Sequence, residues 1–152
     1  MRLTLPRWGS LGAARRFARA ERAWIERERA RLLRMTQPPM AAADRAGLRR
    51  RAERELPARL RQLAVRHGFT VGRITIRDQR SRWGSCSPNG SISLNWRLVL
   101  MPDHVRDYVL LHELAHLRVP NHSRRFWRLM SELCPAWQEA RCWLRDGRPL
   151  RA

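Results

Sequence analysis

Apolar side chains recur with a helical period in five segments of the chain. The pattern predicts helices over residues 11–35, 42–67, 105–117, 123–133 and 135–145. Pro57 lies inside the second of these, where a proline is expected to kink or split a helix. The helix over 105–117 is apolar on nearly every side, so we expect it to be buried.

Shorter runs with alternating or β-branched residues predict strands at 3–5, 71–77, 82–86 and 91–96. Pro88-Asn89-Gly90 joins the last two and is a strong hairpin signal. Gly84, in the middle of a strand, indicates either a bulge or a close approach to the backbone, which near a functional site we expect to come from the substrate. These elements together predict an α+β fold, in which a small antiparallel sheet packs on helices.

The buried helix contains the pattern H-E-x-x-H, formed by His112, Glu113 and His116. Because each helical residue advances by about 100°, the two histidines lie on one face and can bind one metal ion. A glutamate beside them can take a proton from a metal-activated water and pass it to a leaving amine. Zn²⁺ is the expected metal at such a site.

A third histidine, His122, follows a predicted helix end. Pro120 disfavours helical geometry at Val119, and Asn121 tolerates a left-handed conformation that would turn the chain back under the metal. Ser123 can then cap the next helix. The spacing equals that of the metzincin peptidases, but their glycine falls on Val119, so we expect a different turn and no true metzincin.

The pattern H-E-x-x-H also arises by chance, since only three of its five positions are fixed. Here it lies in a segment predicted to be buried, where three histidines and a glutamate are costly without a metal or hydrogen bonds. This burial favours the metal site.

Further motifs accompany the histidines in a fixed order. They are Ser81-Arg82-Trp83-Gly84-Ser85-Cys86-Ser87, Ile92-Ser93-Leu94-Asn95-Trp96, Tyr108-Val109, Asn121-His122-Ser123 and Phe126-Trp127. In these motifs the chain resembles the YgjP-like metallopeptidases, which are related more distantly to the SprT and WLM/Wss1-type zinc proteases. The resemblance implies a minimal gluzincin-like domain over residues 1–152 that lacks the family's first strands. It also implies His112, His116 and His122 as zinc ligands and Glu113 as the general base.

The charge of the chain is strongly positive. The sequence has 32 basic and 13 acidic residues, a formal net charge of +19, and every basic residue other than histidine is arginine. Such a surface attracts polyanions, so non-specific contact with nucleic acid is a candidate property. The expected contact surface lies in the N-terminal half and includes Arg15, Arg16, Arg49, Arg50 and Arg51.

Targeting signals are not recognisable. No apolar run reaches the roughly 18 residues of a membrane span, and residues 1–7 lack the apolar core of a signal peptide. Cys86, Cys134 and Cys142 lack metal-binding spacing and are expected as free thiols. A cytoplasmic protein is therefore expected.

Two functions of different classes fit these observations. The first is a zinc peptidase acting on peptides or proteins, with Tyr108 or Arg82 as a candidate partner for the oxyanion. The second is a basic nucleic-acid-binding protein with a structural zinc site, although structural sites are usually closed by four ligands and rich in cysteine. A protease recruited to its substrates by nucleic acid combines the two.

Overall fold

The computed structural model describes residues 41–145. The strand predicted at 3–5 and the helix predicted over 11–35 lie outside the described residues, as do Arg15 and Arg16. The organisation of residues 1–152 as one domain therefore stays a prediction.

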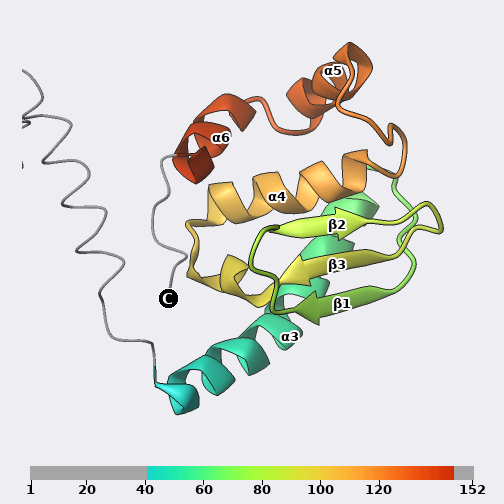
Figure 1. Ribbon diagram of the computed structural model, residues 1–152. Coiled ribbons are helices and arrows are strands. Elements are labelled where there is room, and N and C mark those ends of the chain that lie inside the picture. Colours follow the sequence, from blue (N-terminus) through green and yellow to red (C-terminus); the bar gives the residue numbers. More distant parts are fainter. Residues whose placement is uncertain (1–40, 146–152) are drawn as a thin grey trace, which may run out of the picture. The chain divides into compact units, whose positions relative to one another are not determined.

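The described chain has the predicted order of helix, three strands and three helices, with a 3₁₀ helix in addition (Figure 1). The elements are α3 (Ala42–Arg66), β1 (Ile74–Arg77), β2 (Gly84–Cys86), β3 (Ile92–Asn95), η1 (Trp96–Leu100), α4 (Asp103–Ala115), α5 (Arg124–Leu133) and α6 (Trp137–Arg145). The α+β class is confirmed. Pro57 does not split α3, which continues through it as one helix.

The sheet is mixed, so the prediction of an antiparallel sheet was wrong. Its order is β1-β3-β2: β2 pairs antiparallel with β3 through the predicted hairpin, whereas β1 pairs parallel with β3. Alternation identifies strands but not their neighbours. Consecutive strands are adjacent only about two-thirds of the time, and here the polar connection 78–83 places β2 on the far side of β3.

Asn95, at the end of β3, holds this connection in place. Its side chain is buried, and its Nδ2 donates to the carbonyl oxygens of Gln79 at 2.7 Å and Arg82 at 3.0 Å. Its Oδ1 accepts the backbone N–H of Arg97, the second residue of η1. One amide therefore fixes both the loop that delivers β2 and the start of the next element.

The core lies between α3, the sheet and α4. Leu56, Leu60 and Leu63 form the buried stripe of α3, which packs against η1, β1 and α4. The helix α4 is buried on most sides, as predicted, because β2 lies along one side and α5 and α6 cover another (Figure 1). None of the helices within residues 41–145 is both long and apolar enough to cross a membrane.

Candidate metal centre

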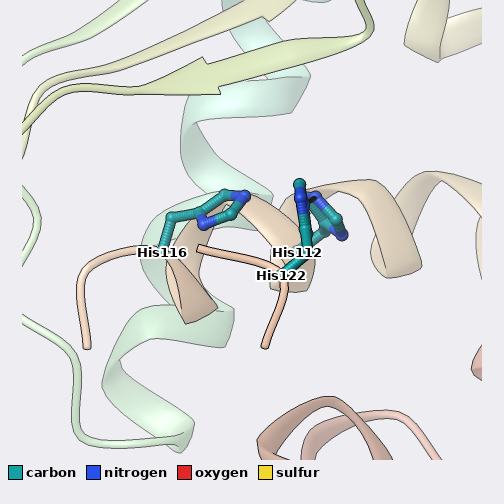
Figure 2. A group of neighbouring side chains, drawn as sticks. All are labelled: His112, His116 and His122. Carbon is teal, nitrogen blue, oxygen red and sulfur yellow. Dashed lines mark hydrogen bonds between the residues drawn. The ribbon is translucent and has the colours of Figure 1, made fainter. Parts of the chain in front are cut away.

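Three histidines from the end of α4 and the following loop come together. His112 lies in the last turn of α4, His116 is its C-cap residue, and His122 comes from the loop before α5. One ligand nitrogen from each lies within 4.8 Å of the other two, and the Nε2 atoms of His112 and His122 are 2.9 Å apart (Figure 2). The predicted convergence of the three imidazoles is present.

The turn that returns His122 differs from the expected one. None of the non-glycine residues in the described chain has a positive φ, so Asn121 does not adopt the left-handed conformation. Instead, Nδ1 of His116 bonds the carbonyl oxygen of Val119 at 3.1 Å, and the Val119 side chain is buried. The valine that replaces the metzincin glycine thus anchors the turn to the core.

This hydrogen bond also fixes the chemistry of His116. A proton on Nδ1 leaves the lone pair on Nε2, which is the usual way a protein orients an imidazole toward a metal. Burial lowers the pKa of His116. Burial, and then the neighbouring histidines, lower the pKa of His112 to about 3. Both rings are therefore neutral at pH 7, the form that binds metal.

Glu113 is buried beneath β2, beside the histidines. Its relative exposure is 5%, and burial raises the pKa of its carboxyl to about 7. The expected close approach at Gly84 exists, but the group that approaches is the side chain of Glu113 and not a substrate. A Cβ on Gly84 would meet Oε1, Cγ and Cδ of Glu113, so only glycine leaves room for it.

A cavity of about 640 Å³ opens over these groups. Its lining consists of Gly84, Ser85, Cys86, Ser87, Pro88, His112, Glu113, His116, Leu117, Pro120 and His122. One wall is therefore β2, whose only strand partner among residues 41–145 is β3. The predicted strand at the edge of the cleft is present, although it is shorter than residues 82–86.

The triad fits a metal ion of zinc type. Two nitrogens bound at about 2.0–2.1 Å in tetrahedral geometry are about 3.3 Å apart, close to the 2.9 Å between His112 and His122. Two imidazole nitrogens at that distance share either a hydrogen-bonding proton or a cation. Within the described residues Nδ1 of His112 is buried without a hydrogen-bond partner, which leaves Nε2 as its contact with the other two rings.

Two further residues, Tyr108 and Arg82, were predicted as candidate partners of the oxyanion. The ring of Tyr108 is buried with its centroid 5.9 Å from that of His112. Arg82 is exposed and is not part of the cavity lining.

Cys86 was not predicted at the site. It follows Gly84 by two residues in β2, and side chains two residues apart in a strand lie on the same side, so both positions face Glu113.

Comparisons with known proteins agree with this geometry. The family model described as YgjP-like, metallopeptidase domain, matches residues 41–147. Among solved structures, the metallopeptidase zymogen abylysin of Pyrococcus abyssi superposes with a TM-score of 0.52 at 25% identity, over 61% of this chain and 96% of that one. A comparison with curated proteins gives no match. Since the family match spans well over half of the sequence, the chain belongs to the YgjP-like metallopeptidases.

Proposed function

We propose that this protein hydrolyses peptide bonds with a zinc ion held by His112, His116 and His122, and that Glu113 is its general base. A bound zinc would lower the pKa of a water molecule to about 7 and polarise the substrate carbonyl. The observation that supports the proposal best is the position of Glu113, buried beside three convergent imidazoles at the wall of a cavity.

Glu113 would move the proton. Its carboxylate accepts a proton from the attacking water and later donates it to the leaving amine. Gly84 holds β2 close above this carboxylate, which excludes bulk water from one side of it. A structural zinc site has no use for a buried carboxylate next to its ligands, so this arrangement favours catalysis over the structural alternative.

The wall formed by β2 suggests how substrate binds. A strand that is paired on one edge can accept an extended peptide on the other, through backbone hydrogen bonds that do not depend on the peptide's sequence. We therefore propose protein substrates cleaved with loose specificity along β2. The three free cysteines agree with the cytoplasmic location that forms part of the proposal.

One experiment tests the reaction and the site together. Zinc content and turnover of an unfolded protein substrate are measured for wild type, Glu113→Gln and the control Glu132→Gln, which changes an exposed glutamate of α5. We expect one equivalent of zinc in all three and turnover lowered about 10²–10⁴-fold in Glu113→Gln alone. Comparable turnover in Glu113→Gln would exclude Glu113 as the base.

Contact with nucleic acid is a second candidate property, supported by the outer face of α3. Arg50, Arg54 and Arg61 are exposed and make no ion pair with the described residues. They fall within about 40° of one another around the helix. Arg49 and Arg51 are instead paired with glutamates one turn later. We propose that the three unpaired arginines contribute to phosphate binding that recruits the peptidase to its substrates.

A further inference from the structure

The loop that delivers His122 is joined to the end of α3 by one side chain, that of Arg118. Its Nη2 donates to the carbonyl oxygens of His67 at 3.1 Å and Gly68 at 2.9 Å. Its guanidinium carbon also lies 4.1 Å from the centre of the Phe69 ring. Arg118 stands between two of the histidines in sequence but makes these contacts about 50 residues away.

The end of α3 is shaped to receive this cation. Gly68 has a φ of 67°, and the N–H groups of Gly68 and Phe69 turn back to the carbonyls of Val65 and Ala64. This glycine-terminated end satisfies the carbonyls of Ala64 and Val65 within the turn, whereas those of His67 and Gly68 accept from Arg118. The C-terminus of a helix has partial negative charge, so a guanidinium that bonds these carbonyls is stabilised there.

Apart from Arg118, the loop is held by its own turn and by the helices on either side of it. The hydrogen bond from His116 to Val119 is local to the turn, and the Val119 side chain is buried. Of residues 117–121, all within the described chain, Arg118 alone makes side-chain hydrogen bonds to another element. His122 itself is exposed and touches the site through its ring. The third histidine is thus held from two sides: its ring packs against those of Phe126 and Trp127 of α5, and the loop before it is tied to the end of α3 by Arg118.

We propose that Arg118 is a positioning residue for the metal site and couples it to the end of α3. This inference rests on the proposed zinc site. With the loop tied to α3, His122 is ordered before the metal arrives, and binding loses less conformational freedom than it would with an unrestrained loop. Coupling is reciprocal, so a bound metal should in turn hold the end of α3 more firmly.

The test uses the full chain and zinc itself. Zinc affinity is measured by competition with a chelator for wild type, Arg118→Ala and Arg118→Met, after the far-UV circular dichroism of each metal-free protein has been compared. Methionine keeps an apolar stem over Phe69 but removes the donors, so it decides the question if Arg118→Ala does not fold. The control is Arg66→Ala, which removes an exposed charge from the same end of α3 and loses no hydrogen bond to another described residue.

We expect zinc affinity to fall about 10–100-fold in both Arg118 variants, the range seen when partners that orient ligands are removed, and to stay within about twofold in Arg66→Ala. Zinc should also slow hydrogen exchange of the Phe69 amide in wild type but not in Arg118→Ala, a difference that a purely structural role would not produce. Wild-type affinity in both Arg118 variants would overturn the inference alone. Wild-type protein that binds no zinc would instead contradict the metal site and remove both proposals.

Discussion

A β-carbon on Gly84 would lie 2.6 Å from Oε1 of Glu113 and 2.7 Å from its Cγ. Both separations are far below van der Waals contact, so the backbone of β2 rests directly on the side chain of the proposed base. Glu113 is buried by this strand, and the strand in turn forms a wall of the cavity. The position of β2 and the position of the Glu113 side chain therefore depend on each other.

Gly84→Ala should lower turnover at least tenfold, because the new methyl group must displace either Glu113 or β2. Zinc content should remain near one equivalent, since the three atoms nearest the added Cβ all belong to Glu113 and none to a histidine. The matched control is Gly47→Ala in α3, where a Cβ meets nothing within 4 Å. A helical alanine there should stabilise the fold by about 0.5–1 kcal/mol without altering turnover. Full activity in Gly84→Ala would show that the contact is not needed.

His122→Ala should lower zinc affinity by orders of magnitude, because two histidines of α4 alone form an incomplete site. His104→Ala is the control, since His104 is exposed and lies outside the triad. Added zinc should raise the thermal midpoint of wild type and His104→Ala, as any ligand of the native state does, and raise that of His122→Ala much less. An equal rise in all three proteins would place the metal elsewhere.

Asp78→Asn should destabilise the fold at neutral pH by at most about 1 kcal/mol, the upper end for an ion pair that is partly exposed to solvent. Its carboxylate accepts from Nη1 of the largely buried Arg97 at 2.5 Å, but the Asp78 side chain is 42% exposed, so solvent screens the pair. The Arg97 hydrogen bond lowers the pKa of Asp78. The stabilisation is therefore complete above the ordinary aspartate pKa of about 4 and disappears as the pH falls through the lowered folded value.

Urea unfolding at pH 7 and near pH 3 checks this prediction. The difference in unfolding free energy between wild type and Asp78→Asn should shrink at the lower pH. A difference that stays constant across that range would mean that Asp78 acts through packing and not through its charge.

If the arginine face of α3 binds phosphates, the logarithm of the affinity for duplex DNA should fall linearly with the logarithm of the salt concentration. The slope should be about −0.9 for each phosphate neutralised. The variant with Arg50, Arg54 and Arg61 changed to Ala should have a shallower slope. Glu113→Gln should bind DNA normally, and stimulation of proteolysis by DNA would favour recruitment. Absence of binding to duplex and single-stranded nucleic acid at about 50 mM salt would assign the charge to another role.

Much of the site could be predicted from the sequence because its information is local. His112, Glu113 and His116 share one helix, and the fixed geometry of a helix brings the two histidines together from their spacing alone. The return of His122 toward the other two histidines was also predicted, but the turn that produces it was not. The buried side chain and the carbonyl of Val119 hold this turn, and Asn121 is not left-handed. Burial of a particular valine depends on the assembled core.

The sheet and the cavity wall depend on contacts between distant residues. Hydrophobic alternation located the three strands, yet it says nothing about whether β2 lies beside β1 or beyond β3. The 3₁₀ helix η1 was missed because its five residues, Trp96–Leu100, are too few to show a helical period and contain one arginine, Arg97, among apolar side chains. A bulge and a close approach were both left open at Gly84, and identifying Glu113 as the group that approaches required its position in space.

The hydrogen bonds of the Asn95 side chain limit where residues can be inserted into this chain. Because the Asn95 amide donates hydrogen bonds to two carbonyl oxygens of the connection 78–83, an added residue there would pull β2 away from its place above Glu113. The hairpin tip at Pro88-Asn89 is exposed and lies beyond the last paired residues of both strands. Insertions are tolerated at such tips, and Pro88 lines the cavity. A change of length at the tip would therefore reshape the rim of the cleft, whereas the connection at the other end of β2 must keep its length.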